Sequence, residues 1–256
     1  MRGAKFRRVI VNRPNLRIPF PDRFADRLRG QTVKAVSRRG KYLVVEVSSG
    51  ETLIMHLGMS GWFHVAPIGD RSREPDPHDH VAFVMSSGQR VLFNDPRRFG
   101  FMDLSERGQL ENYPALSAMG PEPLSSDFEA KALARACRGK KVTLKVALLD
   151  QKVVAGLGNI YASEALHRAH LSPRRQASTI AGSSGAPQAS AHRLAAAIKN
   201  VLNDAVERAV ADSYRSSRFR VYDREGTRCP TRQCGGTIRR IVQAGRSTFY
   251  CPVCQR

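Results

Sequence analysis

Four cysteines near the C-terminus have the chemistry and the spacing to hold a metal ion. They stand as Cys229-x4-Cys234 and Cys251-x2-Cys254, with a basic segment between the two pairs. Two close pairs of thiolates joined by a hairpin can occupy the corners of a tetrahedron, which is the geometry of a closed structural zinc site. We therefore predict that Cys229, Cys234, Cys251 and Cys254 bind one structural Zn2+ in a zinc ribbon.

Two disulfides are the alternative interpretation of these cysteines. Zinc is preferred because a Cys-x2-Cys disulfide closes a small, strained loop and because no signal or transit peptide precedes Phe6. Zinc would also keep the hairpin of residues 235–250 rigid, since so short a segment buries too little apolar surface to fold alone. The fifth cysteine, Cys137, is expected to be a buried apolar residue, which points to the reducing cytoplasm.

The charge of the chain indicates a polyanionic partner. Lys and Arg number 42 against 22 Asp and Glu, a formal net charge of +20. This excess favours nucleic acid over a membrane surface, because the sequence has neither an apolar run that could span a bilayer nor a basic stretch with a broad apolar face. The 256 residues are enough for two domains and a small zinc module.

The hydrophobic pattern changes near the middle of the chain, which predicts an α+β multidomain fold. Short β-branched or aromatic runs separated by turn residues predict the strands of an antiparallel β-sandwich or barrel at residues 41–47, 51–55, 80–85 and 89–93. Beyond a Pro-rich linker, helical periodicity predicts helices at residues 128–138, 142–149, 159–170 and 189–210. The predicted domains are residues 1–118, 119–215 and 216–256.

Three segments contain residues suited to contact with DNA. Arg97 and Phe99 in a Pro-containing turn could contact bases and wedge against an unstacked step, although a turn with solvated charges is the ordinary alternative. Met59, between two glycines, could fill a gap in a base stack, whereas a buried Met is the commoner case. The turn before Asn159 could present helix N–H groups to a phosphate, or be only a tight helix cap.

Together these motifs resemble one family, the formamidopyrimidine-DNA glycosylases, from about Gly3 to the C-terminus. The motifs that carry the resemblance are Lys41-Tyr-Leu, His56-Leu-Gly-Met-Ser-Gly61, Asp95-Pro-Arg-Arg-Phe-Gly100, Gly120-Pro-Glu-Pro-Leu124, Gly156-Leu-Gly-Asn-Ile-Tyr-Ala-Ser-Glu164, Val221-Tyr-Asp-Arg-Glu-Gly226 and Thr248-Phe-Tyr-Cys-Pro-Val-Cys254. The resemblance implies a bacterial base-excision repair enzyme, cytoplasmic and nucleoid-associated, with a β-sandwich, a helix–two-turn–helix domain and a zinc finger. Such an enzyme binds damaged double-stranded DNA as a monomer. It excises 8-oxoguanine or formamidopyrimidines and nicks the strand by β,δ-elimination.

The resemblance also implies roles for particular residues. Lys41 corresponds to the lysine assigned proton transfer in β-elimination and phosphate contact. Arg246 corresponds to the finger arginine that binds the phosphates flanking the lesion and is assigned the δ-elimination proton; phosphate binding is the better-founded role, since arginine barely deprotonates. The remaining positions are those that fill the vacated base stack, Met59, Arg97 and Phe99, and those that contact the DNA backbone, His78, Arg97, Lys140, Lys145, Asn159 and Tyr161.

Two departures from the family bear on activity. The family's catalytic proline and glutamate stand in an N-terminal Pro-Glu-Leu-Pro-Glu-Val segment, which this sequence does not contain. We expect Met1 to be an internal methionine of a longer reading frame. The alternative is a non-catalytic protein that binds damaged or abasic DNA, with Lys41 at most a weak substitute amine. The loop at residues 211–219 is also expected to be shorter than the family's, which would affect lesion preference.

Overall fold

A computed structural model describes residues 1–70, 72–210 and 219–256 of the chain. The chain divides into two compact units, Met1–Ser117 and Ala118–Arg256. Each unit is described by itself below. The expected short loop at residues 211–219 lies outside the described residues except for Phe219.

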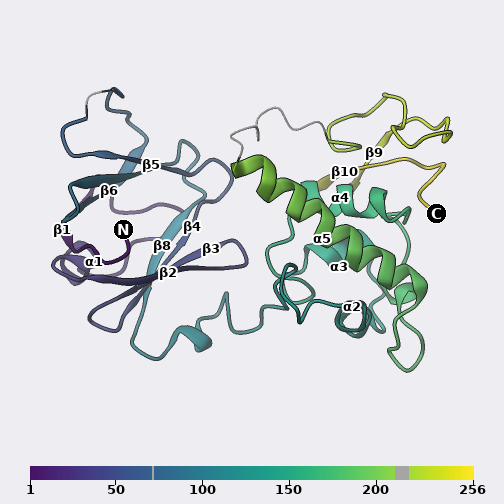
Figure 1. Cartoon of the computed structure of the whole chain (residues 1–256), viewed down its shortest axis with the longest axis horizontal. Coiled ribbons are helices and arrows are strands. Elements are labelled where there is room, and N and C mark those ends of the chain that lie inside the picture. Colours follow the sequence, from purple (N-terminus) through teal and green to yellow (C-terminus); the bar gives the residue numbers. More distant parts are fainter. Residues whose placement is uncertain (71, 211–218) are drawn as a thin grey trace. The chain divides into compact units, whose positions relative to one another are not determined.

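The first unit contains two four-stranded antiparallel sheets (Figure 1). One sheet has the strand order β1-β6-β7-β5 and the other β2-β3-β4-β8. A short helix, α1, lies between β1 and β2 in the chain, and a 3-10 helix follows β8. The bounds are β1 Phe6–Val11, α1 Phe24–Leu28, β2 Val33–Arg39, β3 Tyr42–Val47, β4 Thr52–His56, β5 Trp62–Pro67, β6 Asp79–Met85, β7 Gln89–Asn94, β8 Phe101–Ser105 and the 3-10 helix Leu110–Asn112.

The inner faces of the two sheets share one hydrophobic core. Phe83 and Phe93 from the first sheet are buried with Val45 and Leu53 from the second, and Phe6 packs edge-on against Phe83 at 5.5 Å between ring centroids. Burying such large apolar side chains is the main favourable term in holding the sheets together. The predicted antiparallel β-sandwich is confirmed.

Four strands that sequence patterns did not predict complete the sheets: β1, β2, β5 and β8. Two of them, β1 and β2, lack a clear strand pattern because charged residues interrupt their apolar positions. β2, for example, reads VKAVSRR and buries only Val33 completely, and β1 reads FRRVIV with two exposed arginines. These strands are recognisable only through their partners, since cross-strand packing, rather than intrinsic propensity, stabilises a strand.

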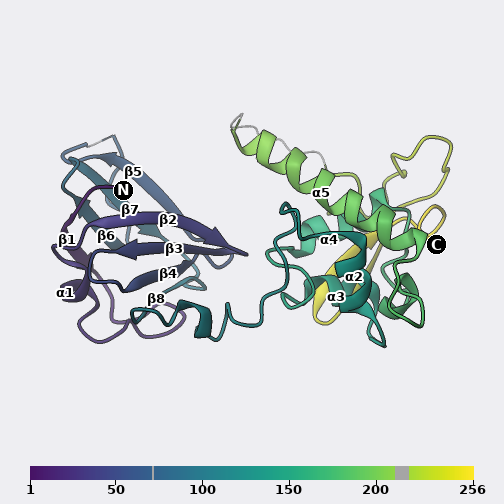
Figure 2. The same cartoon turned by 60° about the horizontal axis from the view of Figure 1, so that its bottom comes forward.

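The second unit begins with a helical region (Figure 2). Its apolar core combines the helices with the loop before α4, which contributes Val153, Val154 and Leu157. Cys137 is fully buried in this core, and burial raises the pKa of its thiol to about 11, as expected for an inert apolar residue. The predicted helices are confirmed; their bounds are α2 Ala130–Cys137, α3 Leu144–Leu149, α4 Asn159–Arg168, the 3-10 helix Ala177–Ile180 and α5 Ala189–Val210.

A two-stranded hairpin and the four cysteines end the chain. The hairpin consists of β9, Arg239–Gln243, and β10, Arg246–Tyr250. Its apolar core is small: Val221, Ile238 and Phe249 are buried with two of the cysteines. So little apolar surface does not stabilise a fold of this length, so the metal site must contribute. Among the described residues, no helix is both long and apolar enough to cross a bilayer.

Candidate nucleic-acid interface and metal centre

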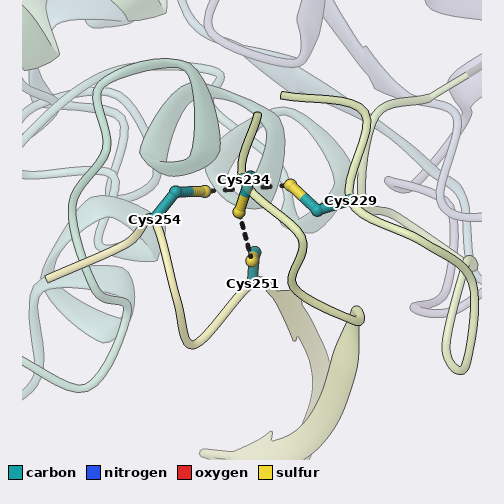
Figure 3. Close-up of side chains that lie close together, drawn as sticks. All are labelled: Cys229, Cys234, Cys251 and Cys254. Atoms are coloured by element: carbon teal, nitrogen blue, oxygen red, sulfur yellow. Dashed lines mark hydrogen bonds between the residues drawn. The ribbon is translucent and has the colours of Figure 1, made fainter. Parts of the chain in front are cut away.

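The four cysteines of the finger point toward one another (Figure 3). Their Sγ atoms all lie within 4.8 Å of one another; Cys229 and Cys254 are 3.8 Å apart, and Cys234 and Cys251 are 3.5 Å apart. Four sulfurs at about 2.3 Å from a tetrahedral zinc are separated by about 3.8 Å, so the cluster fits one structural Zn2+. None of the five cysteines of the chain forms a disulfide, so the disulfide alternative is wrong.

Gly236 leaves the space that this cluster needs. A Cβ atom at this position would lie 2.6 Å from Cys251 Sγ, closer than real Cβ atoms approach, and 3.0 Å from Val253 Cβ. The Gly236 carbonyl also accepts the N–H of Cys229 at 2.8 Å. A side chain here would therefore displace a metal ligand.

The hairpin presents arginine at its turn. Ala244 and Gly245 both have positive φ, 47° and 70°, which is the conformation of a tight two-residue hairpin loop. Arg246 follows this loop directly, is exposed and pairs with Gln243 across the strands. Zinc at the other end of the strands therefore holds an exposed guanidinium in a fixed position, as phosphate binding requires.

Lys145 connects the helical region to the finger. Its buried ammonium donates to Asn159 Oδ1, to Thr248 Oγ1 at 2.7 Å and to the Ser247 carbonyl at 3.2 Å. These three acceptors use all three N–H donors of the ammonium. Burial, and then the positive charge of Arg246, lower the pKa of Lys145 to about 8.

Asn159 is the first residue of α4 and faces the same strand. Gly158 is its N-cap and Gly156 has φ of 72°, so the chain turns tightly into the helix. The Asn159 side chain donates to the Ser247 carbonyl at 2.9 Å. The structure thus brings Lys145, Asn159 and the start of β10, with Arg246, into one basic cluster beside a helix N-terminus, a combination suited to phosphate.

Glu164 on the same helix binds residues 220–222, the segment that leads into the finger. Its buried carboxylate accepts the backbone N–H groups of Arg220, Val221 and Tyr222 at 2.8–2.9 Å. These groups lie outside the hairpin, and an ionised carboxylate is a strong acceptor for several N–H donors at once.

Replacing Glu164 with glutamine is expected to lower the free energy of unfolding by about 2 kcal/mol. The amide keeps one oxygen but turns an NH2 group toward at least one backbone N–H, which then has no acceptor. Urea denaturation of the zinc-loaded protein measures the change. Glu207→Gln, at an exposed position of α5, should change the free energy of unfolding by no more than about 0.5 kcal/mol. Equal effects of the two substitutions would contradict the role of Glu164.

In the first unit, two loops present the residues predicted to enter the base stack. Met59 is 73% exposed and Phe99 is 41% exposed, so neither is a core residue. The Arg97 guanidinium carbon lies 4.6 Å above the centroid of the Phe99 ring, a cation–π contact that holds the two side chains together. An exposed Met, Arg and Phe therefore project from adjacent loops.

Asp95 fixes these loops to each other. Its buried carboxylate accepts the Ser60 hydroxyl at 2.5 Å through one oxygen and the Gly100 N–H at 2.8 Å through the other. Its own carbonyl is 2.9 Å from Nε2 of the buried His80. Ser60 adjoins Met59, and residues 95–100 form the Arg97–Phe99 turn, so a single carboxylate sets the separation of the two loops.

Glycines allow the loops to approach this closely. A Cβ atom on Gly58 would lie 2.4 Å from the Phe99 backbone, and one on Gly100 would lie 2.7 Å from the His56 carbonyl oxygen. Gly58 also has φ of 68°, which side chains rarely adopt. This close backbone contact acts together with the Asp95 hydrogen bonds to fix where Met59 and Phe99 lie.

Lys41 is exposed between β2 and β3, beside a row of three rings. Tyr42, His56 and Phe101 lie opposite one another on adjacent strands, with ring centroids 5.0–5.9 Å apart. Burial, and then the positive charges of Lys41 and Arg17, lower the pKa of His56. His56 Nδ1 accepts the Gly58 N–H at 3.0 Å, so the proton of the neutral ring is on Nε2.

The other predicted DNA contacts are His78, Lys140 and Tyr161. His78 is exposed just before β6, and its N–H donates to Asp76 Oδ1 at 2.7 Å. Lys140 forms an ion pair with Asp150 at 3.6 Å. Tyr161 is half-buried on α4, with its ring centroid 6.5 Å from that of Phe219.

Three residues of the candidate site stand in the motifs that carry the family resemblance, although the sequence predicted no role for them. His56 opens one motif, Asp95 opens another and Glu164 closes a third. Their motif membership was the available signal, but Asp95 also contacts a residue 35 positions away, Glu164 a residue 58 positions away and His56 a ring on a neighbouring strand. Only the tertiary structure shows which partner each side chain has.

A β-sandwich with an exposed arginine–aromatic pair, followed by helices and a four-cysteine finger, defines a multidomain zinc protein of the DNA-binding class. Three family models match consecutive parts of the chain. Residues 1–102 match the formamidopyrimidine-DNA glycosylase N-terminal domain, residues 119–216 its H2TH domain and residues 226–256 the zinc finger found in FPG and IleRS.

Comparison with individual proteins indicates the same family. The whole chain is 52% identical to the formamidopyrimidine-DNA glycosylase of Rhodopseudomonas palustris strain BisA53, covering 94% of that protein. Its fold is similar to that of Lactococcus lactis formamidopyrimidine-DNA glycosylase bound non-covalently to DNA containing an abasic site, with a TM-score of 0.85 and 31% identity over 99% of this chain and 93% of that one. The Thermus thermophilus MutM (FPG) structure has a TM-score of 0.81 and 36% identity over 100% of this chain and 92% of that one. The chain belongs to the formamidopyrimidine-DNA glycosylase family of base-excision repair enzymes.

Proposed function

We propose that this protein binds damaged duplex DNA as a monomer in the bacterial cytoplasm, excises oxidised purines such as 8-oxoguanine and formamidopyrimidines, and nicks the strand at the resulting abasic site. Family membership supports the class of reaction. The observation that carries the proposal for this chain is the pair of loops clamped by Asp95. They expose Met59, Arg97 and Phe99 together, and apolar side chains held beside a guanidinium are suited to enter a base stack.

The wedge supports a base-flipping mechanism. Chemistry on the sugar of a stacked nucleotide requires the target to leave the helix, and the vacated space must be filled to offset lost stacking. Met59 and Phe99 supply apolar surface of that size, and Arg97, held over the Phe99 ring, can donate to the unpaired base opposite the gap. The buried Asp95 keeps the loops in this arrangement before DNA arrives, which lowers the ordering cost of binding.

Phosphate contacts are proposed in each unit. In the first, Lys41 precedes β3 and His56, with its Nε2–H, ends β4, so both residues lie at the same end of these strands, near Arg17. In the second, Asn159 and Arg246 lie around the N-terminus of α4, and the buried Lys145 orients them and adds charge. His78, Lys140 and Tyr161 are proposed as further backbone contacts. Zinc supplies rigidity to the finger and takes no part in bond breaking.

Excision by this family is proposed to pass through an imine. An amine of the protein attacks C1′ of the sugar, the damaged base leaves, and the resulting Schiff base activates the strand for β- and then δ-elimination. We assign the proton transfer of the first elimination to Lys41 and the binding of the departing phosphate to Arg246. Borohydride reduces the imine to a stable amine, which makes the intermediate observable.

The test is borohydride trapping on a duplex with 8-oxoguanine opposite cytosine. Two proteins are compared: the 256-residue chain, and the same chain preceded by the family's N-terminal Pro-Glu segment. A covalent adduct with either protein, together with strand nicking, supports the glycosylase and lyase function. Tight binding by both proteins without any adduct would overturn it and leave the second candidate, a protein that binds damaged or abasic DNA without excising bases.

DNA affinity is expected to fall between pH 7 and pH 9 as Lys145 loses its proton. Its pKa of about 8 means that the ammonium is charged below this pH and neutral above it. At high pH the slope of log K against log salt should also become shallower, because one positive charge beside the proposed phosphate contacts is lost. Anisotropy titrations at several salt concentrations give both quantities.

A variant with arginine at this position isolates the contribution of Lys145. Lys145→Arg stays charged throughout this range and should remove the pH step. The 13Cε chemical shift of Lys145 in the unsubstituted protein reports the same titration directly, even if the variant folds poorly. A pH step that persists in the arginine variant, with no lysine titrating near pH 8, would show that another group is responsible.

A further inference from the structure

His167 lies in the last turn of α4 and reaches the zinc cluster from outside it. The side chain is buried, and its Nε2 atom lies 3.4 Å from Cys229 Sγ and 3.9 Å from Cys254 Sγ. The four cysteines already complete a tetrahedral site, so His167 is not needed as a ligand. It is nevertheless within hydrogen-bond distance of a ligand sulfur.

The chemistry of the cluster determines which way this hydrogen bond runs. A zinc-bound thiolate carries no proton, so its sulfur can only accept, and the imidazole must donate from Nε2. The Thr231 hydroxyl lies 3.3 Å from the same nitrogen and 3.9 Å from Cys254 Sγ. The other ring nitrogen, Nδ1, is buried and has no hydrogen-bond partner among the described residues. Among the described residues, the polar contacts of the His167 ring are therefore made by Nε2, the nitrogen that faces the cysteine sulfurs.

We propose that His167 is an outer-sphere partner of the zinc ion, donating its Nε2–H to the Cys229 thiolate and fixing the metal cluster to helix α4. Four thiolates around Zn2+ leave a net charge of −2 in a partly buried site. A hydrogen bond to a ligand sulfur disperses that charge and fixes the orientation of the ligand, as such bonds do in other metal sites.

This contact completes a series along one helix. At the start of α4, Asn159 donates to the Ser247 carbonyl of β10; near its middle, Glu164 accepts from the segment that enters the finger; in its last turn, His167 reaches Cys229. One rigid helix thus holds the hairpin, the entry segment and the metal ligands. His167 is the member of the series that contacts a metal ligand, and it acts as a positioning residue.

The direct test uses the unsubstituted full chain with 113Cd in place of zinc and 15N in the histidines. The His167 Nε2–H proton is expected to be present and to show scalar coupling to 113Cd through the hydrogen bond to sulfur. A ring protonated only on Nδ1, or an Nε2–H proton with no coupling to the metal, would overturn the proposal. Packing alone produces no such coupling.

Substitutions at His167 test the consequence for metal retention. His167→Phe keeps a ring but removes the donor, and zinc transfer to a competing chelator should be at least about tenfold faster. His167→Gln retains an N–H at a similar reach and should stay within about threefold of the parent protein. The control is His170→Asn, an exposed histidine of the next turn with positive φ, which Asn tolerates. Equal zinc transfer by the Phe and Gln variants would contradict the hydrogen bond, whatever their activity on DNA.

Discussion

Removing zinc is expected to abolish tight DNA binding while leaving the β-sandwich folded. Without the metal, the finger has only the small core of Val221, Ile238 and Phe249, too little to keep the hairpin ordered. Arg246 then loses its fixed position, and so do the Ser247 carbonyl and the Thr248 hydroxyl that Lys145 and Asn159 bind.

The expected loss of DNA affinity is at least about 100-fold, because two charge-assisted phosphate contacts worth about 1.5–3 kcal/mol each disappear. Fluorescence anisotropy with a duplex containing an abasic-site analogue measures the affinity before and after chelation. Amide resonances of Met1–Ser117 should shift little, because its core contains no residue of the finger. Resonances of residues 219–256 should collapse toward random-coil positions.

Two comparisons make this prediction specific to the metal site. Adding zinc back should restore the affinity, and Cys251→Ser should behave like the chelated protein. Cys137→Ala, which alters the cysteine outside the cluster, should keep its zinc and its affinity. A zinc-free protein that binds the abasic duplex as tightly as the holoprotein would show that the finger does not contribute to the interface.

Asp95→Ala is expected to remove discrimination between damaged and undamaged DNA. The alanine leaves the Ser60 hydroxyl and the Gly100 N–H without their acceptors and frees the loops that carry Met59 and Phe99 to separate. We expect the affinity ratio for abasic against intact duplex to fall at least about tenfold, since the wedge must then be ordered on binding. Anisotropy on the two duplexes measures this ratio.

Asp95→Asn is the matched comparison. Its amide oxygen can accept the Gly100 N–H, and its NH2 can donate to the Ser60 hydroxyl oxygen, because a hydroxyl both donates and accepts. We expect this variant to change the ratio by less than about threefold. Thermal unfolding of both variants separates loop effects from global instability. If alanine and asparagine act alike, or if alanine leaves the ratio unchanged, Asp95 does not position the wedge.

The sequence alone predicted those features that depend on short spacing along the chain. The x4 and x2 spacing of the cysteines predicted the zinc site, because two turns of fixed length bring each pair together regardless of the rest of the fold. The same holds for helices α2 to α5, which a 3.6-residue period specifies locally. The proposed roles of Lys41, Arg246 and the DNA contacts came from family motifs, and their placement in the fold leaves those roles to the experiments above.

Only the tertiary structure decided how the site residues support one another. Asp95 meets Ser60 across 35 residues of chain, His167 meets Cys229 across 62, and Lys145 meets Thr248 across 103. Each partner stands on a different element, and no local period or spacing encodes such a meeting. It arises because the packed cores fix where strands and helices lie, and a buried polar group must then find its partner among whatever that packing places beside it.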